Sequence, residues 1–212
     1  MKFSTVIQNF REQGVFDIQQ LRARVPNERS ATLIQQLHRW AKKGLIIPVK
    51  RGFYALPDNM LPKPLAPEYV ANQLYQPSYV TGLWRMNQLG LSPEGLYSVI
   101  SATLGKSTEF TTPFGRYTYQ HIEKKGFFGF ETRMHRGKPT LVACSEKALL
   151  DFFWLKKIEW TETEIRRWRI EDPQKRISHE KLENMAIQWG LPRLRRAADN
   201  FITYLNSIVW IS

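Results

Sequence analysis

The hydrophobic positions of residues 1–56 recur every three or four residues in three successive segments, the spacing of helices that bury one face. These segments span residues 4–14, 17–25 and 30–44. Two short apolar runs, LIIPVK and FYAL, then flank an Arg51-Gly52 turn and predict a β-hairpin with a basic tip. Three helices followed by such a hairpin predict a winged helix-turn-helix, in which one helix enters the DNA major groove.

Polar and apolar residues separate onto two faces of the third helix. We expect the apolar face to pack on the first two helices, through Leu33, Ile34, Leu37, Trp40 and Ala41. On the other face, glutamine can read adenine, arginine can read guanine, and threonine suits a phosphate or a thymine methyl group. Ser30 is the expected N-cap, and the helix N-terminus then offers backbone N–H groups to a phosphate. The expected DNA-binding residues are Arg29, Ser30, Thr32, Gln35, Gln36, Arg39, Lys50 and Arg51.

The charge of the chain weighs against the simplest alternative, an ordinary three-helix domain whose polar helix face is merely solvated. The chain has 31 Lys and Arg against 19 Asp and Glu, a net charge of +12 and an isoelectric point near 9.9. Residues 1–60 hold ten of the basic and four of the acidic side chains, so the net positive charge per residue is more than twice as high in this part as in the rest. That concentration favours a polyanionic partner, here double-stranded DNA.

Four prolines within LPDNMLPKPLAP predict a linker at residues 57–66, because proline interrupts both helices and central strands. The expected fold class is α+β: a winged helix-turn-helix at 1–56, the linker, and a mixed α/β domain with C-terminal helices at 67–212.

The second domain combines both kinds of periodicity. Thr161 and Ser145, like Asp17 in the first domain, have the side chains and positions of helix N-caps. The expected helices are 67–75, 78–90, 145–158, 179–190 and 191–208, and the expected strands are 96–103 and the segments on both sides of turns at 113–115 and 136–138.

Chemistry-bearing residues are sparse. Cys144 is the one cysteine, which excludes an intrachain disulfide and a cysteine-cluster zinc site, and we expect it to be a buried thiol. Lys147 and Asp151 are four residues apart on a predicted helix, where we expect a surface ion pair. His121 and His135 lack zinc-site spacing, and no phosphate-binding glycine loop is present. We therefore expect no enzyme, no cofactor and no metal.

Three stretches of residues 78–155 resemble the AbiEi-type antitoxins: YVTGLWRMNQLGLSPEGLYSVISAT, TTPFGRYTYQHI and CSEKALLDFFWL. The N-terminal pattern also fits, down to KRGFYALP at the end of the hairpin. This resemblance implies a winged helix that represses its own operon and a second domain that counteracts a toxin of a phage-defence system. The toxin of that family is a nucleotidyltransferase-like protein. The helices from Thr161 onward resemble the family only loosely.

The sequence therefore predicts a transcriptional repressor and antitoxin, with operator DNA and a nucleotidyltransferase-like toxin as partners and with a homodimer allowed. Neither a signal peptide nor a membrane-spanning apolar run is visible, so we expect a cytoplasmic protein without a membrane partner. Two alternatives stay open. One is a stand-alone regulator whose second domain dimerises or senses a ligand. The other is an enzyme acting on nucleic acid or protein, which would need titratable groups that converge on a pocket.

Overall fold

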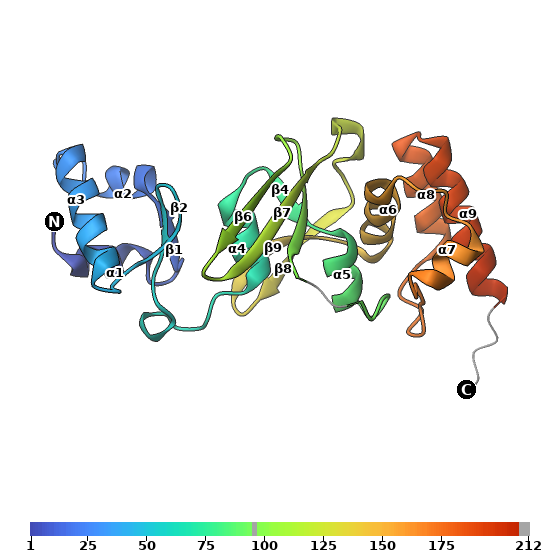
Figure 1. Cartoon of the computed structure of the whole chain (residues 1–212), viewed down its shortest axis with the longest axis horizontal. Coiled ribbons are helices and arrows are strands. Elements are labelled where there is room, and N and C mark those ends of the chain that lie inside the picture. The colour runs from blue at the N-terminus through green and yellow to red at the C-terminus, as the bar shows by residue number, and fades with distance from the viewer. Residues whose placement is uncertain (95–96, 208–212) are drawn as a thin grey trace.

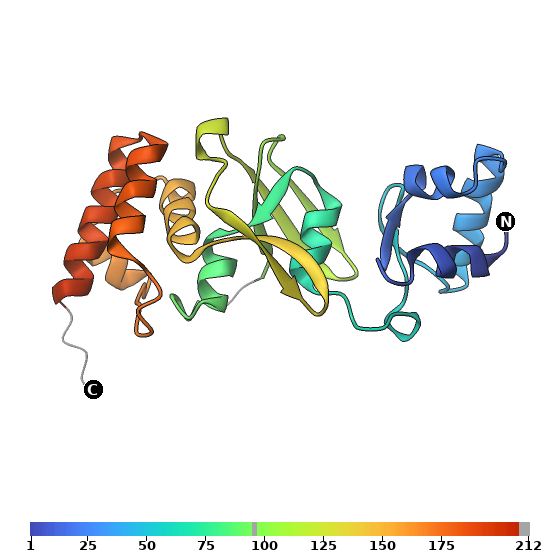
Figure 2. The same ribbon diagram turned by 180° about the vertical axis from the view of Figure 1, so that it is seen from behind.

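The computed structural model describes residues 1–94 and 97–207, and it is elongated, with three parts in a row (Figure 1). A small helical part with a short sheet lies at one end, a larger β-sheet lies in the middle, and a group of helices lies at the other end. The chain passes through them in sequence order, and the view from behind shows the same order (Figure 2). No helix among the described residues is long and apolar enough to cross a membrane.

The N-terminal part has the predicted elements of a winged helix-turn-helix. Its strands form one antiparallel sheet in the order β1-β3-β2. The Asp17 side chain accepts a hydrogen bond of 2.7 Å from the backbone N–H of Gln20, which confirms the predicted cap of the second helix. The elements are α1 (Phe3–Phe10), β1 (Val15–Asp17), α2 (Ile18–Arg24), α3 (Ser30–Lys42), β2 (Ile47–Lys50) and β3 (Phe53–Ala55).

Two predicted serine caps are wrong by one residue. The N-cap of α3 is Arg29, whose extended backbone carbonyl accepts the first helical hydrogen bond from Leu33 at 3.0 Å. In the same way, Cys144 precedes the helix that begins at Ser145, and its carbonyl accepts from Ala148 at 2.9 Å. Neither helix has a side-chain cap. Ser30 and Ser145 are therefore the first helical residues, where a hydroxyl is tolerated but has no capping geometry.

The core of the N-terminal part confirms most of the predicted packing of α3. Leu33 and Leu37 are completely buried, and Phe10 stacks on Phe16 with ring centroids 4.7 Å apart. Ile34, which was expected in this core, is instead 53% exposed. Since each helical residue turns by about 100°, Ile34 is rotated away from the stripe through Leu33 and Leu37 and faces outward.

The middle part is a six-stranded mixed sheet in the order β6-β7-β5-β4-β9-β8. The pairs β5/β7 and β4/β9 are parallel, and the other neighbouring pairs are antiparallel. One helix, α4 (Pro67–Leu74), packs against β4, β5 and β9 and lies in front of the strands in Figure 2. The strands are β4 (Ser78–Val80), β5 (Val99–Thr103), β6 (Thr108–Thr112), β7 (Gly115–His121), β8 (Phe130–His135) and β9 (Lys138–Ala143).

The helix predicted over 78–90 is wrong in its first third. Residues 78–80 form strand β4, and the helix, α5 (Gly82–Gln88), begins only after Thr81. All three residues of β4 are buried, because the strand lies between β5 and β9, α4 packs against it, and Tyr79 is covered by Asp151. Those two partners come from residues 99–103 and 138–143, so the hydrogen bonds that make this segment a strand are invisible in its own sequence. Residue 96, the first of the predicted strand 96–103, lies outside the described part of the chain, as does residue 95.

The C-terminal part is helical, as predicted. The Thr161 hydroxyl accepts a hydrogen bond from the backbone N–H of Glu164 at 3.4 Å and so caps its helix, and Gly190 ends the next one with a φ of +76°. The last predicted helix is confirmed as far as Ser207, and residue 208 lies outside the described residues. The helices are α6 (Ser145–Lys156), α7 (Glu162–Arg167), α8 (His179–Trp189) and α9 (Pro192–Ser207).

The winged-helix part is packed on the β-sheet part. One apolar cluster takes Val49 and Phe53 from the short sheet and Tyr69 and Tyr119 from the β-sheet part. Between them, residues 57–66 contain one 3-10 turn, η1 (Asp58–Met60), and end in the buried residues Leu65 and Ala66. The second such turn of the described chain is η2 (Lys124–Gly126). The proline-rich segment is therefore irregular, as expected, but its end is built into the core.

Candidate nucleic-acid interface

Helix α3 lies at the outer end of the molecule, whereas the short sheet of the N-terminal part faces the β-sheet part (Figure 1). The outward face of α3 is therefore not covered by the rest of the chain. Five of the eight predicted DNA-binding residues are exposed, namely Arg29, Ser30, Gln35, Arg39 and Arg51. The other three, Thr32, Gln36 and Lys50, are half-buried.

Two residues outside the predicted DNA-binding set belong to the same exposed face. Ile34 and His38 are one turn apart, and together with Gln35 and Arg39 they line a shallow depression. The signal for this was available in the sequence, since residues 34, 35, 38 and 39 follow the i, i+1, i+4, i+5 spacing of one helical face. An apolar Ile34 on that face went unnoticed because it was assigned to the core.

Gln36 is turned inward. Its side-chain oxygen is buried and finds no hydrogen-bond partner within residues 1–94 and 97–207. Bidentate reading of adenine uses both the oxygen and the nitrogen of the carboxamide, so this group would have to turn outward first. Gln35, the neighbouring glutamine, is exposed.

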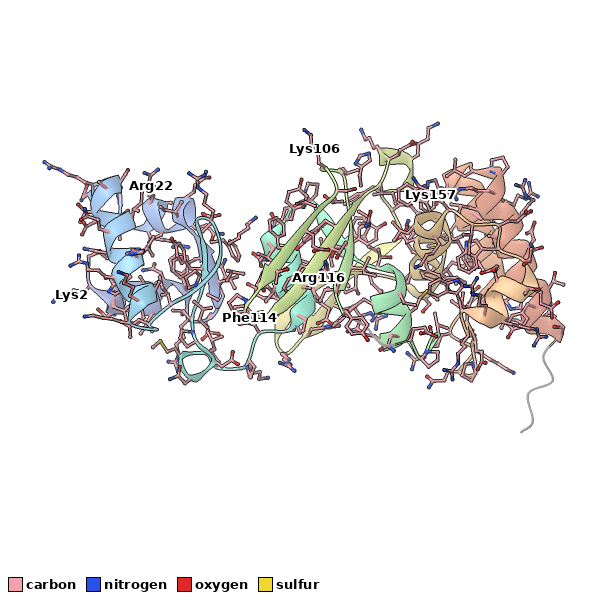
Figure 3. The ribbon with its side chains drawn as sticks, in the orientation of Figure 1. Lys2, Arg22, Lys106, Phe114, Arg116 and Lys157 are labelled. Atoms are coloured by element: carbon pink, nitrogen blue, oxygen red, sulfur yellow. The ribbon has the colours of Figure 1, made fainter. Side chains whose placement is uncertain are left out.

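The electrostatics of the face suit an anion. Helix α3, SATLIQQLHRWAK, has no acidic side chain, and Arg39 and Lys42 lie in its last turn. Helix α2 ends with Arg22 and Arg24, and Figure 3 shows Arg22 and Lys2 extending from the surface of the N-terminal part. Positive side chains that extend from one end of a molecule attract a phosphate backbone over several ångströms.

The hairpin tip is divided between two environments. Arg51 is exposed, but the Lys50 ammonium donates a hydrogen bond to the Leu74 carbonyl of α4 and lies 4.7 Å from the centre of the Phe110 ring. Burial lowers the pKa of Lys50, and the nearby Asp17 carboxylate opposes that shift. In this arrangement Lys50 joins the hairpin to the β-sheet part, and a phosphate contact by Lys50 stays a prediction that needs this hydrogen bond to open.

Residues 4–57 match the family described as "Transcriptional regulator, AbiEi antitoxin". The N-terminal part is an AbiEi-type domain. The match begins within α1 and ends just after β3, so it includes α3 and the whole hairpin. No curated protein matches the sequence. The AbiEi-type domain supports a role in transcription regulation or as an antitoxin.

Outside the AbiEi-type domain, helix α6 carries a buried ion pair that contacts both the sheet and the other terminal helices. The sequence predicted a surface pair between Lys147 and Asp151, and this is wrong: the two side chains are 0% and 1% exposed. Their helix, α6, lies between the sheet and the other terminal helices (Figure 1), so both charges are covered. Tyr79 and Thr81 donate hydrogen bonds to Asp151 at 3.0 and 2.6 Å.

The Lys147 ammonium also lies 3.9 Å from the centre of the Trp189 ring of α8. Burial lowers the pKa of Lys147, and the Asp151 carboxylate opposes that shift. Burial likewise raises the pKa of Asp151, against the effect of Lys147. Each of the two residues thus stabilises the charged form of the other. Together with Tyr79 and Trp189, they link β4, α6 and α8.

Two further groups near α6 are also engaged. One carboxylate oxygen of Glu146 accepts a hydrogen bond from the Ser178 backbone N–H at 3.0 Å, and the other forms an ion pair with the Lys181 ammonium at 2.8 Å. Cys144, which was expected to be buried, is only half-buried, and burial nevertheless raises the pKa of its thiol.

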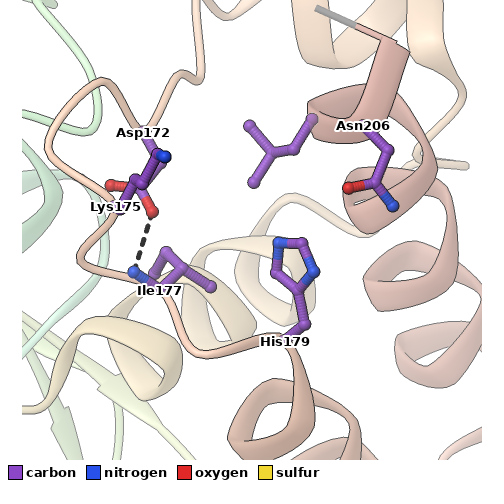
Figure 4. Close-up of a pocket in the computed structure, with 6 residues that line it drawn as sticks. Asp172, Lys175, Ile177, His179 and Asn206 are labelled. Carbon is purple, nitrogen blue, oxygen red and sulfur yellow. Dashed lines mark hydrogen bonds between the residues drawn. The ribbon is translucent and has the colours of Figure 1, made fainter.

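A cavity of about 470 Å³ lies between residues 172–179 and the end of α9 (Figure 4). Its acidic group, Asp172, accepts hydrogen bonds from the backbone N–H groups of Arg176 at 2.7 Å and Ile177 at 2.8 Å. The Asp172 carboxylate therefore stabilises the backbone conformation of the loop that precedes α8. In the described part of the chain, no three His, Cys, Asp or Glu side chains are placed to hold a metal ion.

Proposed function

We propose that this protein is a DNA-binding transcriptional repressor whose helix α3 enters the major groove at the promoter of its own operon. The observation that carries the proposal is the outward face of α3, which presents Gln35 and Arg39, has no acidic side chain, and lies at the free end of the molecule. The family match of residues 4–57 supports the same role. Repression follows from occlusion, because polymerase and repressor cannot occupy the same groove. Such a repressor acts in the cytoplasm, on the DNA.

We also propose that the part beyond the linker counteracts a nucleotidyltransferase-like toxin. The support is the resemblance of residues 78–155 to AbiEi-type antitoxins, together with the match of the N-terminal domain to that family. The enzyme alternative has less support. Lys147 and Asp151 are enclosed and paired with each other, and Asp172 is bonded to backbone N–H groups, so these groups do not converge on an open site.

DNA binding is tested by fluorescence anisotropy of the full chain with a duplex of its upstream region. We expect Arg39→Ala to weaken specific binding by about 1–3 kcal/mol, as loss of a base contact does, and Arg51→Ala to lower the salt dependence by about one phosphate contact. Arg195→Ala is the matched control, since this exposed arginine lies on α9 at the opposite end of the molecule. Absence of binding by the unaltered chain at low salt would refute the DNA-binding proposal.

The antitoxin role is tested in the same chain carrying both Arg39→Ala and Arg51→Ala. This variant and a nucleotidyltransferase-like toxin from the same locus are expressed from unrelated promoters, and growth is measured. We expect the variant that no longer binds DNA to restore growth, because the toxin gene is then transcribed from a promoter that this protein does not control. Rescue that disappears with DNA binding would favour the stand-alone regulator.

A further inference from the structure

Ile34 is an apolar side chain on the face of α3 that is otherwise polar and basic. It is 53% exposed, although the neighbouring apolar residues Leu33 and Leu37 are completely buried. Scattered exposed apolar residues are ordinary on protein surfaces. The position of Ile34 is what distinguishes it, because it lines the same shallow depression as Gln35, His38 and Arg39.

The surroundings of Ile34 restrict what it can contact. An apolar partner protein would have to approach through His38 and Arg39, and the helix has no acidic residue to balance a basic partner. A polyanion that presents apolar groups between its charges fits better. DNA is such a polyanion, since the floor of its major groove carries the 5-methyl group of each thymine.

We propose that Ile34 packs against a thymine methyl group in the major groove and makes α3 selective for an A·T pair at that position. This rests on the proposed function, because it assumes that α3 is the helix inserted into DNA. Ile34 approaches the methyl group from the face on which Gln35 is also exposed. Gln35 then supplies a polar contact to an adjacent base, while Gln36, with its oxygen buried, does not.

Uracil provides the test, because it pairs like thymine and lacks only the methyl group. Duplexes that bind the full chain are first selected from a random-sequence pool. The tightest duplex is then synthesised with uracil in place of one thymine at a time, and binding is measured by anisotropy. For the unaltered protein we expect one position at which uracil weakens binding about fourfold, which corresponds to ~0.8 kcal/mol for one buried methyl group.

The assignment to Ile34 comes from variants of the full chain. Ile34→Ala should bind the thymine and uracil duplexes equally, whereas Ile34→Val, which keeps a branched side chain, should retain part of the difference. Ile187→Ala is the matched control, since Ile187 is 56% exposed on α8 and should leave the fourfold difference unchanged. Circular dichroism of each variant checks that the exposed substitution has left the fold intact.

The outcomes separate this inference from the proposed function. Tight binding of selected duplexes with no effect of uracil at any position would overturn the role of Ile34 and leave DNA binding in place. An effect of uracil that persists in Ile34→Ala would assign the methyl contact to another residue and overturn the inference as well. Failure to select any duplex would overturn both proposals.

Discussion

Replacing Lys147 by methionine should strongly destabilise the protein, although the change is chemically mild and far from the proposed DNA contacts. Methionine keeps the length of the lysine stem but lacks the ammonium group, so both the charge and its hydrogen bond to Asp151 are lost. Lys147 and Asp151 are 0% and 1% exposed, so the variant leaves the Asp151 carboxylate buried without its partner. Tyr79 and Thr81 still donate hydrogen bonds to that carboxylate and supply part of the lost compensation.

Breaking a buried ion pair by removing one partner costs about 3–5 kcal/mol, because an uncompensated charge stays behind. For a chain of this size, each kcal/mol lowers the melting temperature by roughly 2–4 °C, so Lys147→Met should lower it by roughly 6–20 °C. Arg166→Met is the matched control. Glu162 and Arg166 have the same i,i+4 spacing on a helix, but their side chains are 57% and 56% exposed, so the melting temperature should not change measurably.

The pH dependence gives a second, independent check. Burial raises the pKa of Asp151, and Lys147 is the first of the groups that oppose this rise. Without Lys147, the folded-state pKa lies further above the unfolded value, so protonation of Asp151 favours the folded state at low pH and that contribution is lost as pH rises. The deficit of Lys147→Met relative to the unaltered protein should therefore grow as the pH rises above the ordinary pKa of an aspartate. A deficit equal to that of Arg166→Met, or one that does not vary with pH, would refute this reasoning.

Two further predictions concern the junction between the AbiEi-type domain and the β-sheet part. Because the Lys50 ammonium donates a hydrogen bond to the Leu74 carbonyl, Lys50→Met should lower the melting temperature. The same variant should leave the salt dependence of DNA binding nearly unchanged, in contrast to Arg51→Ala. Equal salt dependence in the two variants would show that both residues contact phosphate. Limited digestion with a nonspecific protease should cut first within 57–64, ahead of the buried Leu65 and Ala66, and first cuts within 78–155 would mean that the boundary between the two parts is misplaced.

The features that the sequence predicted correctly are local ones. The Asp17 and Thr161 caps depend on groups three residues away, and the hairpin of β2 and β3 depends on the two residues of its turn. The serines at 30 and 145 show the limit of the same reasoning. A serine at a helix start is a strong signal, but whether it is the cap or the first helical residue depends on which carbonyl accepts the first helical hydrogen bond, and in both helices it is the carbonyl one residue earlier.

The features that were missed depend on distant parts of the chain. Residues 78–80 became a strand because β5 and β9 lie on either side of them. Lys147 and Asp151 are covered because the helix that carries them lies between the sheet and helices α8 and α9. In the candidate site, the polar residues of α3 were assigned correctly to one helix, but the placement of Ile34 and Gln36 required the rotation of that helix against its neighbours.

The arrangement of the three parts bears on how the two proposed activities are combined. Helix α3 is at one end of the molecule and the terminal helices are at the other, so a protein bound at the terminal helices would not cover the DNA-facing side of α3 (Figure 1). The hairpin, in contrast, contacts the β-sheet part through Lys50, Leu74 and Phe110. An influence that a toxin bound at the terminal helices transmits through the protein would therefore reach α3 through the sheet and this junction, which includes the apolar cluster of Val49, Phe53, Tyr69 and Tyr119 as well as Lys50.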